Sequence, residues 1–561
     1  MWHKACGARK CARDIDSGSP STSDSEIAMT HSRALFFAVP LFGIAVIAAA
    51  CGDSSSDAYG EPSDFGDSSG SPGDGSGIGG TGGVGLPPEE ELESSFSAPV
   101  ATGTFVWIAN PTSGRVAYIN ATTLEINVVE AGHAPTYIAA VPDADEDVAI
   151  ILNVLSKDAT ILRAKGEALA AESLPVPSSG NSWAVSENGR WAVAWTDSRR
   201  VKNADPIDGF QDITVLDLTQ GASKSTALTV GYRPVAVAFN TTSTRAFAVT
   251  QDGITAVSLE GDEPAVTQNI KLSDKAADDA TTRDVEITPD GSYALVRREG
   301  EAQISVFSLA DGARTDVALP APATDIDLSP DGSVAVAVVR DTGEVALLPI
   351  PGIVANPAVF PLIKVENALI GSTSLAAESP LAFLYTNAVP SSVLAVLDTS
   401  KVSPMPAFIQ LWAPIQAVFP ARDAAHAIVL HETIEGDGSQ YPAAVSVVPV
   451  AVDLPAKITG LDAPPVSVAI APAGHRALIA TGDAAHPSYR LYVASMPSLQ
   501  ITKFPLASEP IAAGIVAGAD RGFVAQKHPD GRITFVDFKT GEVRTLTGFE
   551  LATQVVDGSG E

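Results

Sequence analysis

Cysteine, basic residues and aromatic residues are all scarce in this sequence. The three cysteines are Cys6, Cys11 and Cys51, so residues 52–561 can form neither a disulfide nor a thiolate metal site. Lysine and arginine number 35 against 66 aspartate and glutamate residues, which gives a net charge of −31. Nucleic-acid binding depends on basic groups that displace counterions, so we expect no nucleic-acid partner. With only 6% aromatic residues, an aromatic platform for carbohydrate is not expected either.

The common catalytic and ligand-binding motifs are also missing. The sequence contains no G-x-S-x-G, no H-E-x-x-H, no phosphate-binding glycine loop and no EF-hand loop. His426 and His431 are an odd number of residues apart on one apolar strand, so they point to opposite faces and cannot share a metal. His133 lies in a Gly-His-Ala-Pro turn and is expected to be a loop residue. These absences favour a protein that is not an enzyme.

The clearest local feature is an uncharged apolar run at residues 34–50, which follows Met29 and Arg33. A short basic start, an apolar stretch and small residues before a cleavage point are typical of a secretory signal peptide, here residues 29–50. The run is shorter than the roughly 20 residues that span a bilayer. Residues 1–28 precede this signal, and we interpret them as a mis-assigned extension, with translation starting at Met29, or as a disordered segment.

Three alanines stand directly before Cys51, and this stretch resembles the lipobox of bacterial lipoproteins, with Ala48 in place of the usual leucine. The resemblance implies cleavage between Ala50 and Cys51 and acylation of the Cys51 thiol. Two or more acyl chains hold a protein stably on a membrane, whereas one chain is marginal. The alternatives are an ordinary signal peptide with an incidental cysteine and a retained signal anchor. The lipobox predicts a lipid-anchored protein of the bacterial cell envelope. In a Gram-negative bacterium, Gly52 in place of aspartate after the anchor favours the outer membrane, on its periplasmic face or at the cell surface.

Residues 51–98 are dominated by glycine, serine, aspartate, glutamate and proline, and contain no lysine or arginine. Such a segment cannot bury enough apolar surface to offset the entropy lost on ordering. We therefore predict a disordered acidic stalk that separates the membrane anchor from the next domain.

From residue 99 to 558 the chain repeats a pattern of short apolar strands and Pro-Asp-Gly-like turns, with a period of roughly 41–51 residues. Segments 284–312 and 325–350 illustrate it. Short β-branched strands at even spacing predict an all-β fold, a β-propeller of four-stranded blades, with seven to ten blades. Nine first strands are expected, and segment 104–130 lacks one. The spare strand at 549–556 is expected to complete that blade and close the ring.

The repeat resembles the YVTN-type propellers of bacterial surface proteins. Segment 104–135, TFVWIANPTSGRVAYINATTLEINVVEAGHAP, has their order of a strand ending in asparagine, a Ser-Gly turn, a second strand and a closing Gly-x-x-Pro. Segment 532–546, RITFVDFKTGEVRTL, repeats the later half. The resemblance implies the propeller fold and says little about function.

One group of acidic residues could form a site. Asp284 and Glu286 share one face of an expected inner strand, and Asp325 and Asp327 repeat the arrangement in the next unit. Inner strands line the channel of a propeller, so the four carboxylates could converge on a hard cation such as Ca²⁺. The alternative is a hydrated channel wall, with Arg283 compensating part of the charge.

Three functions remain open from the sequence. The stalk and lipid anchor favour a binding or scaffold module for an envelope or extracellular partner, either a protein or a glycan. A second hypothesis is a lactonase-like hydrolase, because related propellers catalyse such reactions in their channels, with Arg233, Arg283 and His133 as candidates by position alone. The third is a purely structural envelope protein.

Overall fold

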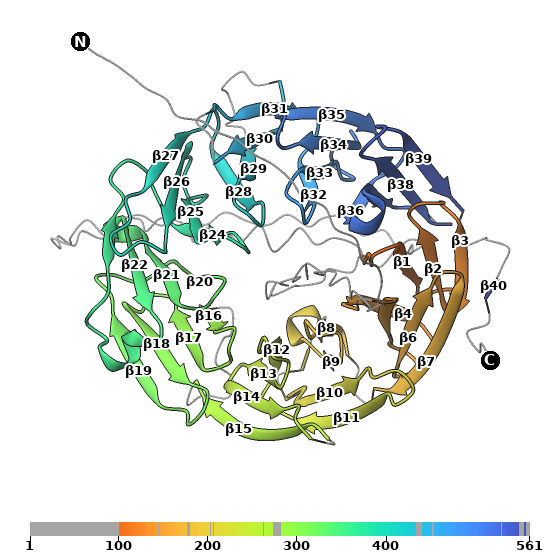
Figure 1. The fold of residues 1–561 in the computed structure, drawn as a ribbon, viewed down its shortest axis with the longest axis horizontal. Coiled ribbons are helices and arrows are strands. Elements are labelled where there is room, and N and C mark those ends of the chain that lie inside the picture. Colours follow the sequence, from red (N-terminus) through yellow and green to blue (C-terminus); the bar gives the residue numbers. More distant parts are fainter. Residues whose placement is uncertain are drawn as a thin grey trace, which may run out of the picture. The chain divides into compact units, whose positions relative to one another are not determined.

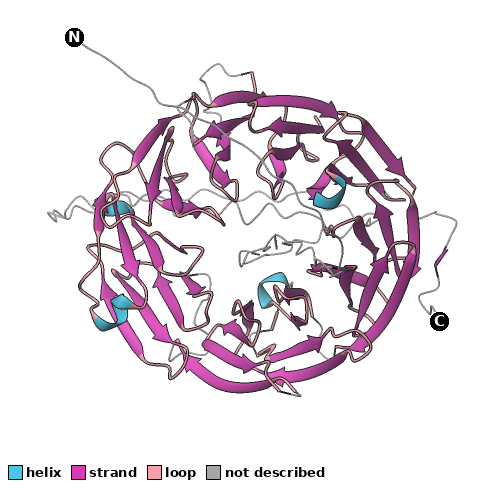
Figure 2. Cartoon of the chain, in the orientation of Figure 1, coloured by secondary structure: helices cyan, strands magenta, loops and turns pink. Residues whose placement is uncertain are grey.

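The chain folds into a β-propeller of ten four-stranded blades, with very little helix (Figures 1 and 2). The computed structural model describes residues 100–548, apart from 144, 177–179, 202–203, 206, 262, 273–281, 433–439, 451–453 and 529, together with the short strand at 555–556. The helical elements in these residues are α1 (Gly352–Ala355) and the 3₁₀ turns Ser198–Arg200, Arg340–Thr342 and Ala517–Ala519. The prediction of an all-β propeller is confirmed, at the upper end of the expected blade count. Segments 1–28, 29–50 and 51–98, with Ala50 and Cys51, lie outside the described residues.

The second and third strands of each blade are buried on both faces, because a neighbouring blade packs on each side. In β29, Ile428 and Leu430 pack toward the next blade, while Ala427 and Val429 pack toward the preceding one. This explains why these strands have nearly unbroken apolar sequences. The second strands are β2 (Arg115–Asn120), β5 (Asp147–Asn153), β9 (Trp191–Trp195), β13 (Arg245–Thr250), β17 (Tyr293–Arg298), β21 (Val334–Val339), β25 (Leu381–Tyr385), β29 (His426–Glu432), β33 (Arg476–Thr481) and β37 (Arg521–Gln526). The third strands are β3 (Ile126–Glu130), β6 (Asp158–Lys165), β10 (Asp212–Asp217), β14 (Gly253–Ser258), β18 (Gln303–Ser308), β22 (Glu344–Pro349), β26 (Val393–Asp398), β30 (Ala443–Pro449), β34 (Arg490–Ser495) and β38 (Arg532–Asp537).

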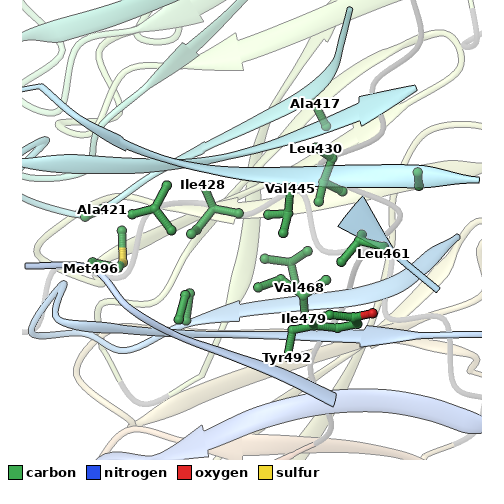
Figure 3. Close-up of a cluster of buried hydrophobic side chains, with 14 residues drawn as sticks. Ala417, Ala421, Ile428, Leu430, Val445, Leu461, Val468, Ile479, Tyr492 and Met496 are labelled. Atoms are coloured by element: carbon green, nitrogen blue, oxygen red, sulfur yellow. The ribbon is translucent and has the colours of Figure 1, made fainter. Parts of the chain in front are cut away.

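The core between two such blades is shown in Figure 3, where side chains from β28–β30 meet those from β32–β34. Ile428, Leu430 and Val445 are fully buried on one side, and Ile479 is fully buried on the other. Complete burial of an aliphatic side chain contributes about 1.5–3 kcal/mol, so each blade junction is a substantial apolar core. The ring is therefore held together mainly by packing between blades.

The inner strands surround the channel and alternate between blade-facing and channel-facing residues, as in β16, where Arg283, Val285 and Ile287 are buried and Asp284 and Glu286 are half-buried. The inner strands are β1 (Phe105–Asn110), β4 (Pro135–Val141), β8 (Ser182–Val185), β12 (Pro234–Phe239), β16 (Arg283–Ile287), β20 (Asp325–Leu328), β24 (Ser372–Leu375), β28 (Ile415–Pro420), β32 (Pro465–Ile470) and β36 (Pro510–Val516). The antiparallel order gives the ring two faces. The turn face has the connections between first and second strands and between third and fourth strands. The loop face has the connections between second and third strands and those between blades.

The outer strands are polar on one side and contribute few buried residues, as the exposure of alternate residues in β15 shows. They are β7 (Ala168–Pro175), β11 (Lys224–Thr229), β15 (Ala265–Lys271), β19 (Arg314–Ala318), β23 (Leu362–Lys364), β27 (Ala407–Gln410), β31 (Lys457–Leu461), β35 (Gln500–Pro505), β39 (Val543–Thr547) and the closing strand β40 (Val555–Val556).

The Pro-Asp-Gly turns lie on the turn face and contact the preceding blade. Gly332 has a φ of +69°, and a Cβ at this position would lie 2.4 Å from a side-chain carbon of Pro289 in the turn before it. Only glycine satisfies both the left-handed backbone and this close approach. The repeated glycine in the sequence therefore reflects blade packing as well as turn geometry.

In five blades a buried polar residue near the end of the second strand lies opposite the first residue of the inner strand, where a β-bulge interrupts the pairing. We call this position the blade clamp; it is occupied by Asn153, Thr250, His431, Thr481 and Gln526. At His431 and Gln526 the clamp side chain links the loop before the inner strand to a hydroxyl on the third strand. In these two blades the clamp fixes the point at which the inner strand enters the channel wall.

The ring closes between the last blade and the first one. The first blade contains β1, β2 and β3, and its fourth position is occupied by β40, which pairs Val128 with Val555 and Val129 with Val556. The expectation that segment 104–130 lacks a first strand is wrong, because Phe105–Asn110 forms the inner strand and the missing strand is the fourth. The chain leaves β39 on the loop face, where β3 begins, and this explains why β40 runs parallel to β3 while the other outer strands are antiparallel.

Side chains reinforce this seam. Arg521 on β37 donates to the carbonyl oxygens of Ala121 (2.7 Å) and Thr122 (3.0 Å) in the first blade. Phe523 and Phe535 of the last blade pack with Val106 and Ile119 of the first. The seam therefore resembles other junctions, which also combine an apolar core with an arginine contact to the neighbouring blade, as from Arg245 to the carbonyl oxygen of Leu309 at 2.9 Å.

Candidate functional site

A cavity of about 1800 Å³ lies in the channel. It is lined mainly by the inner strands β4, β8, β12, β16, β20 and β24 and by the turns that follow them, with single residues from β28 and β32. In Figure 1 these strands form the inner rim of the ring. A cavity of this size, with apolar strands and several polar side chains in its wall, is the kind of site at which proteins bind ligands.

The four carboxylates expected to face the channel do so. Asp284, Glu286, Asp325 and Asp327 all line the cavity, at corresponding positions of β16 and β20. No three His, Cys, Asp or Glu side chains gather into a metal-binding group within the part of the chain that the structure describes. The structure thus brings the four residues to one wall without assembling a set of cation ligands.

Two of these carboxylates connect neighbouring blades. Asp284 accepts a hydrogen bond from Nε of Arg297, whose Nη1 donates to the carbonyl oxygen of Ala323 on the next blade at 3.2 Å. Asp325 accepts from the backbone N–H of Thr373 on β24 at 2.7 Å. Part of the acidic pattern at 284 and 325 therefore stabilises the ring.

The cavity wall is strongly acidic. It contains nine acidic residues and three basic ones: Glu187, Asp197, Asp284, Glu286, Asp290, Asp325, Asp327, Asp331 and Glu378, against Arg199, Arg200 and Arg283. Arg297 and Arg422, which are not part of the wall, pair with Asp284 and Glu378. Among the described residues, the wall and these two arginines together carry four more acidic than basic residues. The wall therefore favours a cationic ligand and repels an anionic one.

The charge is distributed unevenly along the channel. The three arginines belong to the loop-face end, where a second-to-third strand loop holds Arg199 and Arg200, and Arg283 begins β16. At the turn-face end lie Glu187, Asp290, Asp331 and Glu378, one in each of four first turns. This end has no basic residue among the described residues that line it. A cation would thus be attracted most strongly to the turn-face mouth.

The acids of the turn-face mouth differ in their surroundings. Burial raises the pKa of Glu187. Burial alone would also raise the pKa of Asp290, but hydrogen bonds from Ser292 and Thr288 outweigh it and lower that pKa. Asp331 in the next turn is similar, with Ser329 and Ser333 as its partners. The aspartates of the Pro-Asp-Gly turns therefore stay ionised while also stabilising their own turns.

At the loop-face mouth lies a compact polar group around the 3₁₀ turn Ser198–Arg200, which was not predicted from the sequence. Asp197 is buried and binds Arg199 through both oxygens, with a shortest distance of 2.7 Å. Asn181 accepts from the backbone N–H of Asp197 at 2.7 Å and donates to its carbonyl oxygen at 3.0 Å. Burial lowers the pKa of Arg200. The Asp-Ser-Arg-Arg sequence after β9 was the available signal, but its position at the channel depends on the whole loop.

The three residues considered for a hydrolase do not converge. Arg283 lines the cavity, is buried and donates to the carbonyl oxygen of Thr250 at 2.5 Å. Arg233 donates instead to the carbonyl oxygens of Asp205 and Asp208 in a loop. His133 is exposed in its turn, and no histidine is among the described residues that line the cavity.

His426 and His431 both lie on β29. His431 is fully buried at a blade clamp, with Nε2 2.7 Å from Ser446 Oγ and Nδ1 3.1 Å from the carbonyl oxygens of Ala413 and Pro414. A carbonyl only accepts, so Nδ1 donates and Nε2 accepts from the serine. Burial lowers the pKa of His431 to about 4 and that of His426 to a smaller extent.

No protein-family model and no curated protein matches the chain. Similar solved structures include the dihydro-heme d1 dehydrogenase NirN in complex with DHE, at 14% identity over 77% of this chain and 79% of that one, with a TM-score of 0.41. They also include a eukaryotic initiation factor, at 10% identity over 70% and 96%, with a TM-score of 0.45. The hydrazine synthase of Kuenenia stuttgartiensis matches at 14% identity over 46% and 76%, with a TM-score of 0.31.

None of these likenesses says what this chain does. In the described residues, no helix is both long enough and apolar enough to span a bilayer.

Proposed function

We propose that this protein is a lipid-anchored binding module of the bacterial cell envelope, whose channel receives a cationic segment of a partner protein from the turn face. The observation that supports the channel most directly is its volume of about 1800 Å³ combined with nine acidic residues against three arginines. A lysine or arginine side chain that enters such a wall replaces water with carboxylate partners. A neutral glycan gains nothing from this charge, so a basic protein segment is the better candidate.

The envelope location rests on the sequence. Ala50 and Cys51 follow an apolar run typical of a signal peptide, and the lipobox resemblance implies an acyl anchor at Cys51. A tether of this kind keeps a binding domain at a membrane, which is the arrangement that a receptor or scaffold needs.

Peptide binding to the full chain tests the channel. We would measure fluorescence anisotropy with three labelled twelve-residue peptides, rich in arginine and lysine, rich in glutamate, or uncharged. The triple variant Glu187→Gln, Glu286→Gln, Asp327→Asn removes three carboxylates from the wall. We expect the basic peptide alone to bind, to weaken with added salt, and to lose at least about tenfold in affinity in the triple variant.

The control removes the same charge elsewhere. Glu125, Glu172 and Glu366 are exposed and do not line the cavity, so their replacement by glutamine should leave binding within about twofold. Equal weakening in both triple variants would mean that net charge alone attracts the peptide, and the channel proposal would then be wrong.

The anchor has its own test. Wild-type and Cys51→Ala proteins are expressed in cells supplied with labelled palmitate. The Cys51→Ala protein should carry no label and should not be held on membranes. A Cys51→Ala protein that keeps the label, or a wild-type protein that takes up none, would contradict the lipid anchor without affecting the channel.

A further inference from the structure

Exposed apolar side chains concentrate on two neighbouring blades. Eleven large hydrophobic residues are exposed among those the structure describes, and seven of them fall within residues 359–412, which belong to the blades β20–β23 and β24–β27. They are Val359, Leu362, Leu369, Val402, Met405, Phe408 and Trp412. Monomeric proteins seldom concentrate apolar residues in this way unless the surface binds something.

A groove accompanies this surface. It has a volume of about 630 Å³ and lies between the loop that follows β22 and the loop that follows β26, with Val359, Phe360 and Val402 in its walls. The first loop is held in place because Ile353 of α1 is fully buried against β18–β22. The groove is therefore preformed.

The outer strand β27 borders this surface and differs from the other outer strands. Each of the eight other antiparallel outer strands contains at least one charged residue, for example Lys224 in β11, Lys457 in β31 and Arg544 in β39. β27 reads Ala-Phe-Ile-Gln, and three of its four residues are exposed. In Figure 1 it lies at the outer rim, and within the described residues it pairs only with β26. Charges on edge strands normally prevent pairing with other chains, so β27 is an unprotected edge.

Charge is absent on both sides of this edge. Residues 402–421 contain no charged residue, in a protein whose net charge is −31. At the loop-face end Trp412 is 76% exposed, on a loop fixed by hydrogen bonds from the Leu411 and Ile415 N–H groups to Ser392 and Ser391. A rigidly held, exposed tryptophan is the type of residue that dominates binding energy at protein interfaces.

From these observations we propose that β27 binds an extended, uncharged, apolar segment of a partner protein, which adds as a strand to its outer edge. The strand's main chain pairs with β27, and its side chains contact Trp412 at one end and Val402 and Met405 at the other. A second copy of this chain is disfavoured because each copy has a net charge of −31 and the two repel. An anionic membrane surface is disfavoured for the same reason.

This surface is separate from the channel and needs no cationic ligand, so the two proposals can fail independently. The probes are nine-residue uncharged peptides in which valine or leucine alternates with serine or threonine, each with a twin carrying aspartate at its centre. Binding to the full chain is followed by methyl NMR of its methionines. Met405 is 88% exposed beside β27, whereas Met496 is fully buried in the core and is the internal control.

We expect the uncharged peptides to shift the Met405 methyl signal and leave the Met496 signal unchanged, with at least tenfold weaker binding of the aspartate twins. Ala407→Lys restores a charge to the edge, as in the other outer strands, and should weaken binding at least tenfold. The matched variant Ile207→Lys adds the same charge away from β27, at a residue that is 85% exposed. It should bind the peptides like the wild type.

Four results would overturn the proposal. These are no Met405 shift with any peptide of the set, unchanged binding by Ala407→Lys, concentration-dependent dimers that Ala407→Lys abolishes, or binding to uncharged phosphatidylcholine vesicles that Trp412→Ser abolishes. Basic-peptide binding in the channel should be unaffected by Ala407→Lys, which separates this test from that of the proposed function.

Discussion

The blade clamps of β28–β31 and β36–β39 occupy the same position but use opposite hydrogen bonds. His431 donates through Nδ1 to the carbonyl oxygens of Ala413 and Pro414, whereas Gln526 accepts through Oε1 from the N–H groups of Ala507 (3.0 Å) and Ser508 (3.1 Å). Both then pair with a hydroxyl on the third strand, Ser446 or Thr534. In these two blades the groups that the preceding loop presents, carbonyl oxygens or N–H groups, decide whether the buried side chain donates or accepts.

The two clamps should differ most in the unfolding free energy that each loses when its polar residue is replaced by glutamate. In Gln526→Glu the carboxylate still accepts from both backbone N–H groups, so we expect a loss of about 1 kcal/mol in unfolding free energy. In His431→Glu the carboxylate faces two carbonyl oxygens in a fully buried site, and the loss should be about 3–5 kcal/mol. Urea denaturation at pH 7 measures both. Equal losses would show that the direction of the hydrogen bonds does not matter.

Lowering the pH should produce the second-largest difference between the two clamps, because His431 can titrate and Gln526 cannot. The folded pKa of His431 is about 4, below its usual value of 6.5, so the unfolded chain binds this proton more readily than the folded one. Its contribution to stability is therefore complete above pH 6.5 and is lost as the pH falls toward 4, by about 3 kcal/mol at most. His431→Gln keeps a donor and an acceptor and cannot titrate. Denaturation midpoints between pH 7 and 4 should fall more steeply for the wild type than for this variant, and parallel curves would contradict the assignment.

The smallest effect concerns the third-strand hydroxyls. Ser446→Ala removes the hydrogen bond to His431 and should cost about 1 kcal/mol. Thr534→Val removes two hydrogen bonds, one with Gln526 and one of 2.8 Å with Thr545, and should cost slightly more. Thr545→Val is the control for that second bond, and a loss equal to that of Thr534→Val would mean that Gln526 contributes little through its amide.

The sequence predicted the propeller because its second and third strands are buried on both faces and therefore apolar throughout. The outer strands were far less visible, since a strand such as β15 alternates polar and apolar residues over only seven positions. The first blade was misjudged for a related reason. Its sequence contains three strands, and only the ring topology reveals that the absent one is the fourth.

The channel was predictable only in part. The alternation at 284–286 and 325–327 placed four carboxylates on the cavity wall. It could not show that Arg297 and the Thr373 N–H group already bind Asp284 and Asp325, because those partners come from a different strand and a different blade. The polar group around Asp197 was not predicted for the same reason, because its position at the channel depends on how a long loop folds back.

The start of the described chain has a mechanical consequence. Val100 lies beside β1, where its carbonyl oxygen accepts from Trp107 N–H at 3.1 Å, and Thr102 N–H donates to Phe105 at 2.9 Å. The bridge between Ala101 and Val106 and the hydrogen bond from Trp107 Nε1 to Thr102 Oγ1 at 3.0 Å belong to the same short pairing. If the protein is tethered at Cys51, a force along the chain enters the described part at this pairing, before it reaches the pairing of β1 with β2.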